Sequence, residues 1–233
     1  MSNPQVIYSG ESYLVLDKPT GWVVNSATTT NAPVIEEWLQ KSMKELVILE
    51  VERSGIVHRL DKETSGVLIV ARTESAMLKL QNQFKERAVV KEYLALVHGK
   101  VKAPGVVKLD VGRLPWNRER FGAVNGGRES ETSYEIVGVY RNKDGEFTLL
   151  RLKPKTGRTH QIRIHMKHIG HPVVSDTFYA GRKTSRRDRE WCPRLFLHAA
   201  KISFMDPDTH KQVLHESGLP RDLLFVLSKL IRM

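Results

Sequence analysis

The sequence lacks the features that mark secreted, membrane-spanning and cysteine-rich metal proteins. One cysteine, Cys192, is present among 233 residues, which excludes an internal disulfide and a multi-cysteine zinc or iron–sulfur site. No window approaches the ~18 consecutive apolar residues of a membrane span, and the N-terminus has no basic region followed by an apolar run. We therefore expect a soluble, cytoplasmic protein without membrane attachment.

Acidic residues are also scarce relative to basic ones. The chain has 26 Asp and Glu against 37 Lys and Arg, a formal net charge of +11. Such an excess favours a polyanionic partner, although charge alone does not separate RNA from DNA or an anionic membrane. Hydrophobic residues make up 40% of the chain, so it can bury a sizeable core of one or two domains.

Apolar patterning predicts more strand than helix. Runs bounded by turn residues predict strands at 6–8, 13–16, 67–71, 93–98, 106–109, 132–140, 147–152 and 195–204. Helical spacing predicts helices at 33–46, at 74–87 with Thr73 as its cap, at 160–169 with Thr159 as its cap, and at 221–230. Most of 102–130, and all of 181–194, are expected to be irregular. The order is not βαβα, so we predict an α+β fold with a mixed, mostly antiparallel β-sheet flanked by helices and loops.

One stretch combines an acid, a turn and a buried strand. Residues 58–66 read His-Arg-Leu-Asp-Lys-Glu-Thr-Ser-Gly and lead directly into the apolar run 67–71. A polar loop at the end of a strand is a place where scaffolds hold catalytic side chains, and Asp61 is the acid in it. Taken alone, the stretch is more typical of a surface turn in which Asp61 accepts backbone N–H bonds and Gly66 gives backbone freedom.

Five motifs in sequence order resemble the RluA-type pseudouridine synthases, which isomerise uridine in structured RNA. Residues 58–66 resemble the central motif of that family. The segments 13–21, 91–99, 152–172 and 195–200 resemble its N-terminal, tyrosine, arginine and last motifs. The resemblance implies the pseudouridine synthase fold and one catalytic domain over 1–233, without a separate N-terminal RNA-binding domain.

The resemblance also implies the catalytic residues, and no cofactor or metal. The reaction breaks the N-glycosidic bond, turns the base and rejoins it through carbon. Asp61 supplies the carboxylate, either by attacking the sugar carbon or by removing a ribose proton; Tyr93 packs on the base; Arg163 is the cationic partner of Asp61. On the expected helix, Arg163 shares a face with His160 and Lys167 that would look into the site.

The expected RNA-binding residues lie in two of the motifs. Arg59 suits base extrusion, because a long cationic side chain can fill the vacancy left in the stack. The start of the 160–169 helix suits a phosphate. His58 and His198 are equally well interpreted as structural residues, and the basic segment 181–194 as a solvated loop or an RNA contact. The full set of predicted RNA-binding or substrate-binding residues is Arg59, His58, Leu60, Thr64, Gly66, Arg158, Thr159, His160 and Gln161.

The composition is also compatible with three other functions. Histidines at 160, 165, 168 and 171 suggest a metal site, but the His-Glu-x-x-His pattern of helical zinc proteases is absent. A nuclease that uses His and Lys, or an RNA binder without activity, would also fit a basic chain. The presence of Asp61, Tyr93 and Arg163 together argues against the last of these.

The sequence departs from the family pattern at two places. The family pattern usually has glycine before the aspartate where this chain has Ser175-Asp176, so the pattern does not predict the turn there. The segment 112–130 follows no family pattern, which leaves ribosomal and transfer RNA both open as substrates. We expect structured RNA as the partner, and a monomer without an obligatory protein partner.

Overall fold

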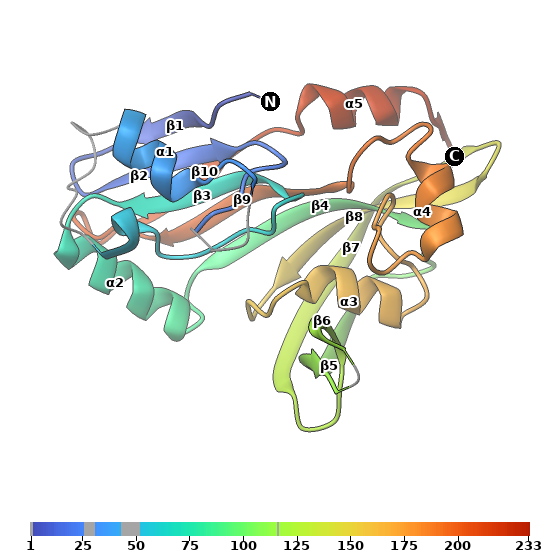
Figure 1. Ribbon diagram of the computed structural model, residues 1–233, viewed down its shortest axis with the longest axis horizontal. Coiled ribbons are helices and arrows are strands. Elements are labelled where there is room, and N and C mark those ends of the chain that lie inside the picture. The colour runs from blue at the N-terminus through green and yellow to red at the C-terminus, as the bar shows by residue number, and fades with distance from the viewer. Residues whose placement is uncertain (1, 26–30, 43–51, 116) are drawn as a thin grey trace. The chain divides into compact units, whose positions relative to one another are not determined.

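The computed structural model describes residues 2–25, 31–42, 52–115 and 117–233 (Figure 1). The chain forms two compact units, the first comprising Met1–Lys91 with Ala199–Gly218 and the second Glu92–His198 with Leu219–Met233. In these described ranges no helix has both the length and the apolar character needed to cross a membrane.

The first unit is a set of strands, mostly paired antiparallel, with helices beside it. The strand order is β1-β2-β3-β9, with β10 paired to β9. All seven residues of β3 are buried, as expected of a strand formed by an unbroken apolar run. The elements are β1 (Gln5–Ser9), β2 (Tyr13–Lys18), α1 (Ile35–Ser42), a 3₁₀ turn (Glu52–Gly55), β3 (Ser65–Ala71), α2 (Glu74–Lys85), β9 (Leu197–Met205, in this unit from Ala199) and β10 (Gln212–Glu216).

Local sequence signals place the helices of this unit. Thr73 caps α2 as predicted, because its Oγ1 accepts the N–H of Ala76 at 3.1 Å. Met77 and Leu80 bury the apolar face of that helix. The expected helix 33–46 is present as α1 over its described part, and residues 43–46 lie outside the described residues.

The second unit is built on five antiparallel strands in the order β4-β8-β7-β5-β6, and β11 pairs with β7. Helix α3 packs against β5, β6, β7 and β8 (Figure 1). Its Ile162 and Met166 join Ala95, Leu150 and Leu152 in one core cluster. The elements are β4 (Val90–His98), β5 (Gly105–Leu114), β6 (Asn117–Ala123), β7 (Arg128–Asn142), β8 (Gly145–Pro154), α3 (Gln161–His168), α4 (Arg182–Asp188), α5 (Arg221–Ser228) and β11 (Ile231–Arg232).

The predicted α+β class, with its mixed and mostly antiparallel sheet, is confirmed, but the irregular character expected for 102–130 is wrong. That segment forms the paired strands β5 and β6. Two of its glycines are strand residues at close approaches: a Cβ on Gly112 would lie 2.6 Å from Val124 Cγ2, and one on Gly122 would lie 2.6 Å from Leu114 Cδ2. Glycines that indicate a loop in sequence therefore serve packing between strands here.

Two further local predictions are wrong. The segment 181–194 contains helix α4, whose basic residues are exposed while the short side chains Ser185 and Asp188 are buried, so no apolar period marks it. Thr159 does not cap α3. The cap position is His160, which has a left-handed backbone (φ 56°) and makes no side-chain capping bond. Strands β10 and β11 were not predicted.

Candidate active site

Asp61 lies in the turn that leads into β3 in the first unit. Its carbonyl accepts the N–H of Thr64 at 3.1 Å, which closes the turn. The residue before it, Leu60, is buried, whereas Arg59 is exposed and Asp61 is half-buried. Leu60 thus anchors the loop in the core, and Arg59 is accessible to a ligand from solvent.

The segment after β2 holds this turn through its backbone carbonyls. The N–H of Gly21 donates to the carbonyl of Lys62 at 2.8 Å, and Thr20 Oγ1 donates to that of Glu63 at 2.9 Å. Lys18, which is fully buried, donates from Nζ to the carbonyl of Lys62 at 3.4 Å and to that of Trp22 at 2.9 Å. Two of the motifs seen in the sequence therefore form one hydrogen-bonded structure.

Three predicted binding residues of this loop have structural contacts. Ile69 donates its N–H to His58 Nε2 at 2.9 Å, and the His58 ring stacks on Phe84. Burial, and then the charge of Lys91, lowers the pKa of His58 to about 3, so the ring is neutral at pH 7. Gly66 has φ 116°, and a Cβ there would lie 2.1 Å from the carbonyl oxygen of Ala199. Thr64 is buried.

Arg163 is held on α3 in the second unit by a bidentate ion pair. Its Nε donates to Asp176 Oδ2 at 2.7 Å and its Nη2 to Asp176 Oδ1 at 2.8 Å, with both residues buried. The guanidinium lies 5.2 Å from the ring centroids of Phe178 and of Tyr179. The ion pair between Arg163 and Asp61 that the family resemblance implies stays a prediction.

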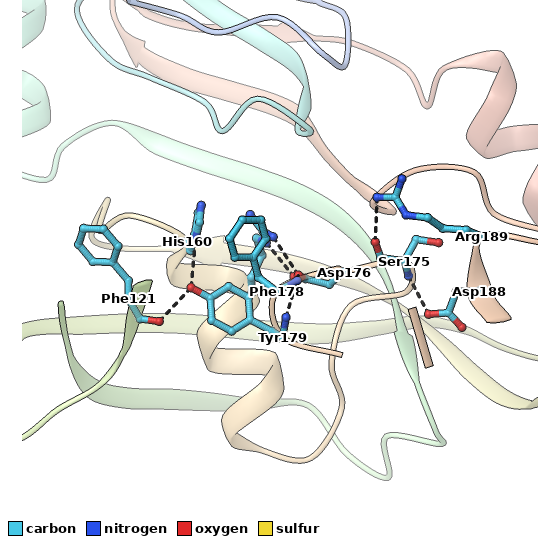
Figure 2. A network of polar contacts seen from close by, with 9 residues as sticks. Phe121, His160, Ser175, Asp176, Phe178, Tyr179, Asp188 and Arg189 are labelled. Atoms are coloured by element: carbon cyan, nitrogen blue, oxygen red, sulfur yellow. Dashed lines mark hydrogen bonds and ion pairs between the residues drawn. The ribbon is translucent and has the colours of Figure 1, made fainter. Parts of the chain in front are cut away.

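Asp176 also organises the chain that follows it (Figure 2). Its Oδ1 accepts the N–H of Phe178 at 2.9 Å and that of Tyr179 at 3.0 Å. The carboxylate of Asp176 thus accepts four hydrogen bonds, two from the Arg163 guanidinium and two from backbone N–H groups, which uses its whole accepting capacity. It therefore fixes the guanidinium of Arg163 and the two aromatic rings beside it at once.

Tyr179 connects β6 to the start of α3. Its hydroxyl donates to the carbonyl of Phe121 at 3.0 Å and lies 2.9 Å from His160 Nδ1 (Figure 2). The hydroxyl has one proton, so His160 Nδ1 is the donor in the second bond. Phe178 is 46% exposed, and Arg120 lies 5.8 Å from its ring centroid. We call Phe121, His160, Phe178 and Tyr179 the aromatic cluster.

The turn before α3 is shaped by Gln161. Its Oε1 accepts from Thr156 Oγ1 at 2.7 Å and from the N–H of Arg158 at 3.0 Å, while its Nε2 donates to the carbonyl of Glu131 and to Thr132 Oγ1, both at 3.0 Å. These four bonds use the whole capacity of the amide, which we therefore interpret as a structural group. Arg158 and Thr159 are half-buried, and their predicted phosphate contact stays a prediction.

The remaining predicted residues lie on strands or on α3. Tyr93 is half-buried in β4 and packs against the core cluster that contains Leu152, its partner in register on β8. His198 is fully buried in β9. His165 is fully buried, and its Nε2 lies 2.7 Å from Ser130 Oγ. The expected common face of His160, Arg163 and Lys167 is divided, because Arg163 is buried and Lys167 is exposed.

Comparison with known proteins adds the family. The model of the RNA pseudouridylate synthase family matches residues 12–168, more than half of the chain. The chain belongs to that family. This pseudouridine synthase is 36% identical to the ribosomal large subunit pseudouridine synthase D of Pseudomonas aeruginosa over 97% of its own length and 71% of that protein.

Two other relatives extend the comparison. An uncharacterised RNA pseudouridine synthase of Aquifex aeolicus is 41% identical over 89% of this chain and 71% of its own. The solved structure of human RNA pseudouridylate synthase domain containing 1 is similar with a TM-score of 0.75 and 26% identity, covering 93% of this chain and 83% of that one. The pseudouridine synthase fold is thus shown together with the family.

Three residues that support the candidate site of this pseudouridine synthase were not predicted from the sequence. They are Lys18, Asp176 and Tyr179. Lys18 stands in the N-terminal motif, where a lysine that ends an apolar strand before Pro19 was an available signal. For Asp176, the sequence pattern drew attention only to the preceding residue, Ser175, where the family usually has glycine. No local pattern predicts the role of Tyr179, because its partners Phe121 and His160 lie 58 and 19 residues away in the sequence.

Proposed function

We propose that this enzyme isomerises uridine to pseudouridine in ribosomal RNA, with Asp61 as its catalytic carboxylate. The observation that carries the proposal is the Asp61 turn. Its carbonyls at 62 and 63 accept bonds from the N-terminal motif, and the carbonyl at 61 accepts the N–H of Thr64 within the turn. A turn fixed in this way presents the half-buried carboxylate of Asp61 close in sequence to the exposed Arg59. The ribosomal substrate is supported by the naming of relatives such as that of Pseudomonas aeruginosa.

The isomerisation needs no net change of atoms or electrons. The bond between the ribose C1′ and the uracil N1 breaks, the base turns, and a bond between C1′ and C5 forms. C5 loses a proton and N1 gains one. Asp61 acts on the ribose, either by attack on C1′ or by removal of a ribose proton, and neither route requires a metal ion.

Two residues of the second unit complete the proposed chemistry. Arg163 provides a fixed positive charge, because its guanidinium is oriented by Asp176 rather than by solvent. Tyr93 provides an aromatic ring for the base from β4, a strand whose core contacts make it rigid. Positioned charges and rings of this kind stabilise a transition state without reorganisation.

Recognition of the RNA is assigned to Arg59, Arg158 and Thr159. Arg59 replaces the extruded uridine in its stack, and leaving the stack costs a few kcal/mol. Arg158 and Thr159, before α3, bind phosphate. The net charge of +11 supplies the remaining affinity without base specificity. In this account the enzyme acts as a monomer.

The direct test is to incubate the purified protein with transcripts of large-subunit ribosomal RNA, small-subunit ribosomal RNA and transfer RNA, each with and without EDTA. Nucleoside mass spectrometry measures pseudouridine, and gel electrophoresis measures chain length. We expect pseudouridine in the large-subunit transcript, equally with EDTA, and intact chains. Modification of transfer RNA alone would contradict the ribosomal assignment, and cleaved RNA without pseudouridine would contradict the reaction.

A further inference from the structure

Ser175 has a backbone conformation that serine rarely adopts. It is fully buried, and its φ of 62° lies in the left-handed region, which is unfavourable for L-residues other than glycine. The sequence pattern that this chain resembles usually has glycine at this place. Something in this protein must therefore hold the serine in the conformation that glycine adopts without strain.

Helix α4 and the residues after it provide the restraint (Figure 2). The N–H of Ser175 donates to Asp188 Oδ2 at 2.9 Å, and its carbonyl accepts from Arg189 Nη2 at 3.4 Å. Its Oγ donates to the carbonyl of Cys192 at 2.5 Å. All three polar groups of the serine are thus bound to one segment, 188–192.

Asp188 is itself fixed from two sides. Its Oδ2 lies 2.9 Å from His98 Nε2, at the end of β4. The carbonyl of Asp188 accepts the N–H of Cys192 at 2.7 Å, so the carboxylate and the Cys192 carbonyl belong to one closed turn. A buried carboxylate held by a strand and by its own turn is a rigid acceptor for Ser175.

The conformation of Ser175 sets the direction of the next residue, which is Asp176. That carboxylate forms both hydrogen bonds to the Arg163 guanidinium. A change of φ at 175 would rotate the chain that carries Asp176, because φ and ψ are the only soft torsions of the backbone. A continuous series of bonds therefore leads from α4 to Arg163.

We propose that Asp188 and Ser175 are positioning residues for Arg163: the segment 188–192 clamps Ser175 in the left-handed conformation and so aims Asp176 at the guanidinium. The inference rests on the proposed function in one respect: it expects the geometry of Arg163 to affect the rate of pseudouridine formation. The clamp itself concerns the geometry of Arg163 and is measurable without any RNA.

The first test uses Ser175→Ala and Ser175→Gly. Both variants lose the Oγ bond to Cys192, but only alanine is strained in the left-handed region, so the pair isolates the backbone conformation. The readout is hydrogen exchange of the Arg163 Nε–H by NMR, assigned with Arg163→Lys. We expect about tenfold faster exchange in Ser175→Ala, equivalent to roughly 1.4 kcal/mol, and an exchange rate closer to wild type in Ser175→Gly.

Arg194 supplies an internal control in the same unit. Its Nε donates to Asp222 Oδ2 at 2.6 Å and its Nη2 to Asp222 Oδ1 at 3.0 Å, which is the same bidentate geometry. The Arg194 Nε–H should exchange at its wild-type rate in both variants. Equal acceleration at Arg163 and Arg194 would mean general loosening of the unit and would overturn the proposal, as would no change at Arg163.

The second test is a double-mutant cycle that combines a replacement of Asp188 with Ser175→Gly. The replacement is Asp188→Ala. If that variant does not fold, Asp188→Asn is used, because its amide keeps an oxygen acceptor. If Asp188 acts by holding the left-handed turn, its replacement should accelerate Arg163 exchange less in the Ser175→Gly background than in wild type. Additive effects in the two backgrounds would overturn the proposed route through Ser175.

Activity gives a separate readout. In single-turnover assays Ser175→Ala should lower the rate of pseudouridine formation by about tenfold with unchanged RNA affinity, and Ser175→Gly should restore much of the rate. If wild type itself forms no pseudouridine, the proposed function fails while the exchange data still decide the clamp. If wild type is active and Ser175→Ala reacts at the same rate, the positioning role is refuted.

Discussion

The loop that carries Asp61 and the surroundings of Arg163 are stabilised in different ways. Backbone carbonyls of the loop accept bonds from the short segment 18–21, and both parts carry recognisable sequence motifs. Arg163 is held by the side chain of Asp176 and by the aromatic cluster, whose members come from β6, the start of α3 and the segment after 175. A local motif can be read from sequence, whereas a side-chain network assembled by tertiary structure cannot.

Removal of Asp176 should have the largest effect on stability. Asp176→Ala takes the carboxylate away from a buried guanidinium, and breaking a buried pair costs roughly 3–5 kcal/mol. Urea denaturation measures the free energy of unfolding. Asp222→Ala is the matched control, because Asp222 also pairs with an arginine but its side chain is 43% exposed. Equal losses in the two variants would show that Arg163 is not specially dependent on its partner.

Acid should weaken both regions, because each contains a histidine whose surroundings lower its pKa. Burial, and then Lys91, lowers the pKa of His58 to about 3, and burial, and then His168, lowers that of His165 to about 4. Below the ordinary pKa of 6.5 the unfolded chain binds protons that the folded chain refuses, so stability is full above that pH and is lost as the pH falls. Each histidine contributes a slope of ~1.4 kcal/mol per pH unit.

The slope can be assigned by mutation. His165→Gln should flatten the dependence of the unfolding free energy on pH by about one proton between pH 6.5 and 4. Replacement of the exposed His210 by Asn controls for the loss of a histidine. A slope unchanged in His165→Gln would mean that the folded protein protonates this side chain as readily as the unfolded chain does.

Loss of Lys18 should show how much this side chain stabilises the Asp61 loop, as Asp176→Ala shows how much Asp176 stabilises the surroundings of Arg163. Lys18→Met keeps the buried stem but removes the donor to the carbonyls of Lys62 and Trp22, at a cost of ~2 kcal/mol. Lys62→Met, an exposed change in the same loop, should stay within ~0.5 kcal/mol of wild type. The two variants are compared by urea denaturation, and equal stabilities would remove Lys18 from the scaffold of the Asp61 loop.

The smallest predicted effect distinguishes stacking from phosphate binding at Arg59. If this exposed side chain fills the gap of an extruded uridine, Arg59→Ala should lose more activity on a folded stem-loop than on a flexible RNA with the same flanking sequence. The expected differential in kcat/KM is about tenfold, or roughly 1.4 kcal/mol. Equal losses on both RNAs would assign Arg59 to phosphate binding or to loop structure.

Sequence reasoning recovered the features that depend on short stretches. Thr73 caps α2, the strand after Asp61 is buried throughout, and the predicted strands 132–140 and 147–152 lie within the paired strands β7 and β8. It failed where tertiary contacts override composition. Gly112 and Gly122 are strand residues, and α4 is a helix whose inward side chains are too short to give an apolar period.

Within the candidate site the same division applies. The turn of Asp61 follows from its motif, but the bidentate partner of Arg163 does not, since Asp176 lies 13 residues away and is aimed by a left-handed serine. The family pattern shows only that Ser175 stands where glycine is usual; it does not show which contacts hold the serine there. The hydrogen bonds that Ser175 donates to Asp188 and Cys192, which allow serine there, are formed only in the folded chain.

The central claim is that Asp61 performs the chemistry, and the most direct measurement is single-turnover pseudouridine formation by Asp61→Asn on a large-subunit ribosomal RNA transcript. Glu63→Gln removes one charge from the same loop as the matched control. We expect no turnover with Asp61→Asn, RNA binding close to wild type because the basic surface supplies most of the affinity, and retained activity in Glu63→Gln. Turnover by Asp61→Asn within about tenfold of wild type would contradict the account and assign the chemistry to another residue.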